Sequence, residues 1–212
     1  MSEISYSKQN DNIECIHYKD WNKTYPPHTH TRHLTVGYIE DGKMCMVLNG
    51  RKKIYSKGDR FQIPPDTVHQ IMPVDNQTYS MVVLCIKVKE IFFDANCESK
   101  NKNTYKELSI RLKELRDTIL ENPENIYLID EMAMDSNISP FYMIRQFKKA
   151  FGLTPHQFQI QCKVRKAQKL LEEQSVSETT YDAGFCDQSH LDKSFQKLVG
   201  LTPKEYKKVL KD

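Results

Sequence analysis

The stretch SPFYMIRQFKKAFGLTPHQF at residues 139–158 recurs as DQSHLDKSFQKLVGLTPKEY at residues 187–206, 48 positions later and without a gap. The apolar positions coincide between the two copies, and both copies contain Gly-Leu-Thr-Pro. Glycine ends a helix in the left-handed conformation, while threonine caps the next helix and proline fits its first position. The repeat therefore predicts two helix-turn-helix units in one chain, an arrangement suited to reading two neighbouring turns of DNA.

Each unit is expected to have a short first helix and a longer second helix. The first helices are predicted at 128–134 and 177–183, and the second helices begin after the caps Ser139 and Asp187. Helical spacing turns Met143, Phe147 and Ala150 inward, and Leu191, Phe195 and Leu198 do the same in the second unit. A helix from 155 to about 173 joins the units, and its length of roughly 28 Å approaches the ~34 Å between successive major-groove faces.

The first part of the chain has a different pattern. Short apolar stretches alternate with turn signals such as Asp41-Gly42 and Asn49-Gly50, and Asn-Gly is the strongest short hairpin signal. We expect a sandwich or barrel, because many short strands must have their edges closed or covered. The expected strands are 13–18, 34–39, 44–48, 51–55, 60–63 and 80–88.

From residue 104 the apolar period becomes helical. Thr104 is expected to cap a helix whose apolar side chains form one stripe: Leu108, Leu112, Leu115 and Ile119. The stripe fits either core packing or a short dimer seam. The polar, turn-rich segment 94–103 before it is the expected linker.

Residues 112–212 resemble the DNA-binding domain of the AraC/XylS family of transcription regulators. The shared features are Ala133 in the first helix, Ser-Pro at 139–140, KAQKLL at 166–171, the Gly-Phe-x-Asp-Gln-Ser pattern at 184–189, and the two GLTP motifs. One departure is Thr179-Thr180, where the family has Ile-Ala, and two hydroxyls at packing positions imply a looser second unit.

The resemblance gives positions for contacts with double-stranded DNA in the major groove. The base-reading candidates are Phe141, Ile144 and Arg145 in the first recognition helix, and Gln188, Ser189, His190 and Lys193 in the second. Arg145 is the strongest candidate, because a guanidinium can bind guanine O6 and N7 together. Lys148 and Lys149 are expected to contact phosphates. A plain helical bundle without a DNA role is the alternative, which the mixed polar and aromatic outer faces disfavour.

Residues 27–73 resemble the cupin-like domain that often precedes this DNA-binding unit. His28, His30 and His69 fall where metal-dependent cupins place three histidine ligands, and three imidazoles suit a divalent transition metal such as Zn, Fe, Ni or Cu. The glutamate expected after the second histidine is missing, since Leu34 and Thr35 stand at those positions. Internal hydrogen bonds or contact with an organic effector remain alternative roles for the histidines.

The predicted fold is therefore α+β with two domains: an N-terminal all-β cupin-like (jelly-roll) barrel at 1–94, and a C-terminal all-α domain at 112–212. Residues 95–111 form the linker and the start of a connecting helix, and the helix-turn-helix units span about 126–152 and 175–201. A small ligand could occupy a barrel of this size, with lining residues from strands 34–39, 44–48 and 60–63. Trp21, just before the histidines, is expected to pack rather than to bind.

The expected function is a bacterial one-component regulator, not an enzyme, which senses a small molecule or metal and binds DNA. The alternatives are a metal-dependent cupin enzyme fused to a DNA-binding domain, or a barrel used only for protein contacts. RNA polymerase is a possible further partner, and the protein is expected to act as a monomer or homodimer.

The composition is compatible with this function. Charge alone does not reveal the DNA partner, since the formal net charge is +3, although Lys and Arg exceed Asp and Glu by 13 to 8 over 139–212. The six cysteines have no paired spacing, which favours reduced thiols in the cytoplasm. A polar start and short apolar runs argue against a signal peptide and a membrane span.

Overall fold

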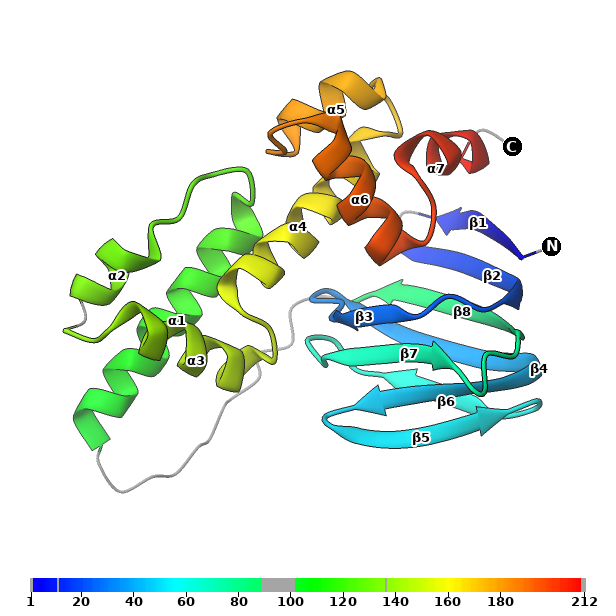
Figure 1. Cartoon of the computed structure of the whole chain (residues 1–212), viewed down its shortest axis with the longest axis horizontal. Helices are drawn as coiled ribbons and strands as arrows, with labels where there is room; N and C mark the ends of the chain where they lie inside the picture. The colour runs from blue at the N-terminus through cyan, green and yellow to red at the C-terminus, as the bar shows by residue number, and fades with distance from the viewer. Residues whose placement is uncertain (1, 11, 89–101, 136, 211–212) are drawn as a thin grey trace. The chain divides into compact units, whose positions relative to one another are not determined.

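The computed structural model describes residues 2–10, 12–88, 102–135 and 137–210 (Figure 1). Strands and helices are segregated along the chain, which confirms the predicted α+β class. The molecule divides into two compact units: unit 1 is Met1–Ile91 with Phe195–Asp212, and unit 2 is Phe92–Ser194. The expected domain boundary at 94 and most of the expected linker lie outside the described residues.

Unit 1 contains eight antiparallel strands in the order β1-β2-β8-β4-β7-β3, with β5 and β6 also paired to β4 (Figure 1). The strands are β1 Glu3–Asn10, β2 Ile13–Trp21, β3 Tyr25–His28, β4 His33–Leu48, β5 Arg51–Ser56, β6 Arg60–Ile63, β7 His69–Pro73 and β8 Tyr79–Lys87. This half-barrel confirms the predicted cupin-like architecture.

The long strand β4 connects the two sheets of unit 1. Its first half pairs with β8 and β6, and its second half pairs with β5 and β7. The two separate strands predicted at 34–39 and 44–48 are thus one strand, and that part of the prediction is wrong. Asp41-Gly42 marks an irregularity in the pairing with β8, where Gly42 has φ +73°.

Other local predictions in unit 1 are confirmed. The β4–β5 hairpin turns at Asn49-Gly50, and both residues have positive φ as a tight hairpin requires. Trp21 is 2 % exposed in a core that also contains Ile39 and Tyr79. At the C-terminal end of the unit, Leu201 packs against this core, and the Tyr206 ring meets Tyr6 edge-on.

Unit 2 holds the helices before the last one. They are α1 Lys102–Glu121, α2 Ile129–Asp135, α3 Pro140–Phe151, α4 Pro155–Leu170, α5 Val176–Asp182 and α6 Gln188–Val199, which crosses into unit 1; α7 Pro203–Val209 follows there. Helix α1 begins at residue 102, so the expected cap Thr104 lies inside its first turn instead.

The apolar stripe of α1 is used inside the molecule. Leu112, Leu115 and Ile119 are buried, and α1 packs against α3 and α4. This confirms core packing for these three side chains, and it argues against the dimer seam. Among the described residues, none of the helices has the length and apolar character needed to cross a membrane.

Candidate nucleic-acid interface and histidine centre

The first recognition helix, α3, has the caps that its sequence predicts. The Ser139 hydroxyl accepts a hydrogen bond from the Tyr142 backbone N–H at 3.2 Å, and Gly152 ends the helix with φ +76°. Met143 and Phe147 are buried beneath it. Ala150, which was expected to face inward, is exposed in the last turn of the helix, although helical spacing places it on the same side as Met143 and Phe147.

The outer side of α3 carries the predicted DNA contacts. Arg145, Lys148 and Lys149 are exposed, and Ile144 is half-buried. The Arg145 guanidinium lies 5.6 Å from the centre of the Tyr142 ring, a cation–π contact that the sequence pattern did not suggest.

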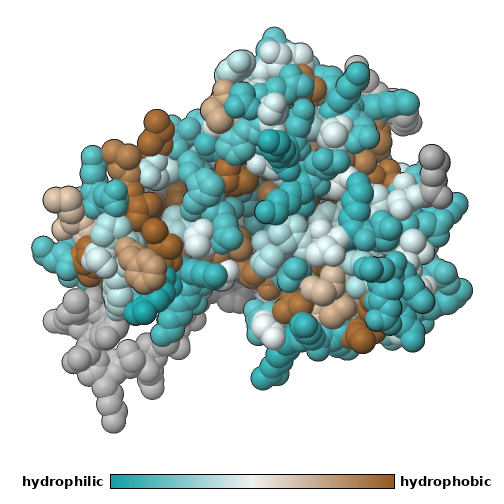
Figure 2. Space-filling model, in the orientation of Figure 1, coloured by the Kyte–Doolittle hydropathy of each residue, from teal (hydrophilic) through white to brown (hydrophobic). Residues whose placement is uncertain are grey.

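Apolar side chains gather beside this basic surface. Figure 2 shows hydrophobic residues over α2 and the start of α3, and the exposed ones in this region are Ile126, Leu128, Met134 and Phe141. Phe141, which is 75 % exposed, stands in the first turn of α3. Exposed apolar side chains at the start of a recognition helix suit contact with thymine methyl groups.

The second recognition helix, α6, is capped by Asp187, whose carboxylate accepts a hydrogen bond from the His190 backbone N–H at 2.8 Å. That hydrogen bond is the main cause that lowers the pKa of the Asp187 carboxyl. Gln188, Ser189 and Lys193 are exposed on this helix.

His190 is more constrained than the other candidates on α6. Its ring meets Phe185 edge-on with centroids 5.2 Å apart, and its Nδ1 lies 3.3 Å from the Cys186 sulfur. These contacts hold the imidazole against the protein.

The helix α4, which joins the two helix-turn-helix units, is shorter than predicted. It has 16 residues, or about 24 Å, because it ends at Leu170 rather than near 173. Its start is as expected, with a capping box in which the Thr154 hydroxyl and the Gln157 side chain each bind the other's backbone N–H.

The two threonines of the second helix-turn-helix unit, which were expected to loosen it, are both at buried positions. Thr179 and Thr180 are both buried, and the Thr180 hydroxyl donates to the Val176 carbonyl at 2.8 Å. The Thr179 hydroxyl has no hydrogen-bond partner among the described residues. One hydroxyl is therefore accommodated, and the other carries a desolvation cost.

A set of contacts that the sequence did not suggest joins the second helix-turn-helix unit to the loop after α1. A Cβ added to Gly184 would lie 2.5 Å from the Glu124 Cα, so the two backbones are in direct contact. The Lys163 ammonium donates to the Gly184 carbonyl at 2.7 Å, and Lys166 pairs with Glu124 at 2.9 Å. The hydrogen bond from Lys166 is the first cause that lowers the Glu124 pKa.

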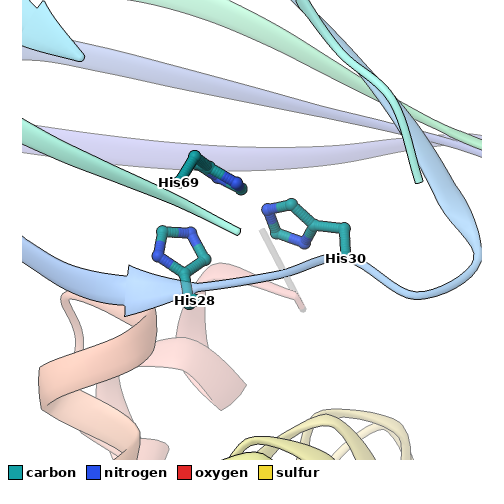
Figure 3. Close-up of side chains that lie close together, drawn as sticks. All are labelled: His28, His30 and His69. Carbon is teal, nitrogen blue, oxygen red and sulfur yellow. The ribbon is translucent and has the colours of Figure 1, made fainter. Parts of the chain in front are cut away.

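Unit 1 brings the three predicted histidines together (Figure 3). His28 ends β3 directly opposite His69 at the start of β7, and His30 follows two residues later, just before the turn at 31–32. One ring nitrogen from each residue lies within 4.8 Å of the others. Strand pairing thus produces the cluster that the sequence resemblance implied.

Backbone carbonyls orient two of the rings. His28 Nδ1 lies 2.8 Å from the Pro26 carbonyl, and His69 Nδ1 lies 3.0 Å from the Thr67 carbonyl. A carbonyl only accepts, so both Nδ1 atoms carry a proton, and in the neutral form of each ring the lone pair then lies on Nε2. Burial lowers the pKa of His69, against a smaller opposing effect of the Thr67 hydrogen bond, and therefore favours its neutral form.

The histidines fit a metal ion in their chemistry, with a small adjustment in geometry. Metal-bound histidines commonly donate their other ring N–H to a carbonyl, as His28 and His69 do here. Tetrahedral zinc with bonds of ~2.0–2.1 Å would need its ligand nitrogens at roughly 3.3 Å, so the rings would have to draw closer. Thr35, at the place of the missing glutamate, is buried, and its hydroxyl has no partner among the described residues.

The strands expected to line a ligand cavity contribute side chains to the core. Ile39, Met46 and Ile63 are buried in one cluster, and the Phe61 ring lies where a Cβ on Gly37 would stand.

Two family models match the chain. The model for the AraC-like ligand binding domain matches residues 11–124, more than half of the chain, and a helix-turn-helix domain model matches residues 132–208. The two matches cover the strand part and the repeat separately.

Relatives and solved structures agree with these matches. The HTH-type transcriptional regulator MtrA of Neisseria gonorrhoeae is 32 % identical over 100 residues, which are 46 % of this chain and only 33 % of MtrA. The HTH-type transcriptional regulator YbfI of Bacillus subtilis is 23 % identical over 84 % of this chain and 86 % of its own length. The crystal structure of ToxT from Vibrio cholerae has a TM-score of 0.60 at 9 % identity, covering 95 % of this chain and 99 % of ToxT, and so shares the fold.

Proposed function

Because the chain belongs to the AraC family of helix-turn-helix transcription regulators, we propose that α3 and α6 bind adjacent major grooves and that the histidine centre takes part in sensing. The observation that carries the DNA part is the repeat itself: two capped helices with buried apolar inner faces and outer faces that expose basic and polar side chains. The family assignment supports a regulator over the enzymatic alternative. We also propose that the protein is located in the cytoplasm, where it binds DNA.

In this proposal α3 supplies the main base contacts. Arg145 reads guanine, Phe141 and Ile144 contact apolar base edges, and Lys148 with Lys149 neutralises phosphates. On α6, Gln188, Ser189 and Lys193 contact the neighbouring groove, while the packed ring of His190 makes it the weakest of the four candidates.

The DNA part is tested by selecting bound fragments from the genomic DNA of the source organism and footprinting the best site. We expect protection of about two helical turns, roughly 20 base pairs, per chain. Arg145→Ala should weaken binding by ~1–3 kcal/mol and relax the choice at one base pair. Arg51→Ala, an exposed arginine in the β5 strand, is the matched control. Equal affinity and preference for both variants would remove Arg145 from the interface.

For the sensing part, we propose that His28, His30 and His69 hold a divalent transition metal. The converging nitrogens and the two fixed Nδ1–H groups support it. When bound, the metal would supply a charge and a rigid link between β3, β7 and the segment after β3 that carries His30.

Metal content and calorimetric titration with zinc test this assignment. We expect about one equivalent in the native protein and a loss of binding in His69→Ala. His17→Ala is the control, since His17 lies on β2 and binds Glu40 at 2.5 Å. Substoichiometric metal with no titratable site would contradict it and favour an organic effector. A ToxT crystal structure contains an unsaturated fatty acid, which supports that alternative class of ligand.

A further inference from the structure

The loop between α1 and α2 contacts the helix that joins the two helix-turn-helix units. We call residues 122–125 the bridging loop. The Gln159 side chain on α4 donates hydrogen bonds to two backbone carbonyls of this loop, at 2.8 and 2.7 Å. Two helical turns further along α4, Lys166 pairs with the Glu124 carboxylate of the loop at 2.9 Å. Because residues seven positions apart share one face of a helix, the bridging loop lies along a single face of α4.

The bridging loop also meets the turn before the second recognition helix. A Cβ added to Gly184 would lie 2.5 Å from the Glu124 Cα, so the two backbones touch. The Lys163 ammonium, on the same face of α4, donates to the Gly184 carbonyl at 2.7 Å. The second unit is therefore held by a backbone contact to the bridging loop and by a hydrogen bond to α4.

The bridging loop is itself tied to the first helix-turn-helix unit. It follows α1 directly, and α1 packs against α3 and α4. The Tyr127 hydroxyl lies 2.9 Å from the Thr118 carbonyl of α1 and 2.6 Å from the Asn122 carbonyl of the loop, and it can donate to either. A chain of contacts thus runs from α3 through α1 and the bridging loop to the turn before α6.

These contacts limit how the two recognition helices can move relative to each other. Along the chain, the second unit is attached to α4 through the turn at 171–174, and such a short segment can act as a hinge. The bridging loop opposes bending at this hinge in both directions. The Gly184 backbone cannot move closer to Glu124 without a clash, and it cannot move away from α4 without breaking the hydrogen bond from Lys163.

We propose that the bridging loop determines which spacing between the two half-sites of the operator the protein accepts. The inference rests on the proposed binding of α3 and α6 to neighbouring major grooves. One added base pair moves the second half-site by about 3.4 Å along the DNA and by roughly 35° around it. Glu124, Gln159 and Lys166 are positioning residues: they fix the distance and the angle between the recognition helices, so that only one spacing allows both helices to contact bases.

The test is binding to operator fragments in which one base pair is added or removed between the two half-sites. The native chain should lose at least about tenfold in affinity for either fragment, because one recognition helix gives up its base contacts. In the double variant Gln159→Met, Lys166→Met this loss should fall below about threefold, since the second unit can then follow the groove. The double variant Gln168→Met, Lys169→Met is the matched control on α4, where Gln168 accepts a hydrogen bond from Arg165 of the same helix and Lys169 is exposed. It should keep the native preference.

Two further measurements guard against misfolding of the first double variant and provide a readout without DNA. Glu124→Gln keeps the shape of the side chain but removes its charge, and it should relax the spacing preference in the same direction. Glu121→Gln, an exposed residue at the end of α1, is its control. Spin labels at Lys149 on α3 and Lys193 on α6, introduced as unnatural amino acids, report the distance between the two helices in the free protein by pulsed electron paramagnetic resonance. We expect one narrow distance distribution in the native chain and a broader one in the Gln159→Met, Lys166→Met variant.

The outcomes separate this inference from the proposed function. A native chain that binds all three spacings equally would overturn the inference. So would a spacing preference and a distance distribution that stay native in the folded Glu124→Gln and Gln159→Met, Lys166→Met variants, with folding checked by circular dichroism. If the native chain binds no fragment of genomic DNA, the proposed DNA binding itself is wrong, and the spacing rule falls with it.

Discussion

The close contact between Gly184 and Glu124 predicts a large effect of one added methyl group. Gly184 has φ +82°, where a non-glycine residue costs roughly 1–2 kcal/mol. In addition, the new Cβ would lie 2.5 Å from the Glu124 Cα, about 1 Å inside the usual contact distance. Overpacking of this kind costs typically ~1–3 kcal/mol, so Gly184→Ala should destabilise the protein by about 2–5 kcal/mol.

Gly50→Ala separates the two contributions. Gly50 has φ +76°, but nothing lies within 4 Å of its added Cβ. The control should therefore lose only the backbone contribution of roughly 1–2 kcal/mol.

Urea unfolding followed by far-UV circular dichroism measures both variants against the native chain. Helical signal dominates this readout, so it reports mainly on the part that contains Gly184, and the fluorescence of Trp21, which is buried in the core of unit 1, reports on the part that contains Gly50. The footprint adds a functional readout, because α6 follows Gly184 directly, and we expect Gly184→Ala to lose protection at one half of the site first. Equal destabilisation by the two substitutions would refute the close backbone contact, and a full footprint in a destabilised variant would refute its link to α6.

Three further predictions concern charge, pH and a buried hydroxyl. Replacing Lys148 and Lys149 by glutamine should reduce the slope of log affinity against log salt by about 1.8, since each phosphate contact contributes ~0.9; an unchanged slope would make them ordinary surface lysines. Burial lowers the pKa of His69 below its ordinary value of ~6.5. Between these two pKa values the unfolded chain binds one more proton than the folded chain, so the free energy of unfolding should fall as the pH decreases through this window. The fall should be smaller in His69→Asn. Thr179→Val should stabilise the protein by about 1 kcal/mol in urea unfolding, because it removes a buried hydroxyl without a partner among the described residues. A loss of stability would mean that the hydroxyl is hydrogen-bonded in solution.

The sequence located the helical elements well because their signals are local. Ser139 and Thr154 cap the helices that they were expected to cap, and Gly152 ends α3 in the left-handed conformation. These interactions join residues three or four positions apart, so a short window of sequence contains both partners. Ala150 was misplaced because the turn next to a cap is less regular in its burial than the middle of a helix.

The strands were predicted less completely. The expected strands covered β5 and β6 and most of β2 and β8, but β1, β3 and β7 were missed. Most side chains of β1 are polar because it is an edge strand, and β3 contains Pro26-Pro27, which argues against a central strand. Their pairing with distant strands defines them, and that information is absent from the local pattern.

The sequence by itself determined that this chain carries two helix-turn-helix units, and it named three histidines as one group. Only the tertiary structure decided that His28 and His69 face each other across paired strands, that the Gly184 backbone meets Glu124, and that the apolar residues of β2, β8 and β4 share one face. The physical reason is the range of the interactions. Caps and helical periods are satisfied within one turn, whereas strand register and backbone packing depend on partners far away along the chain.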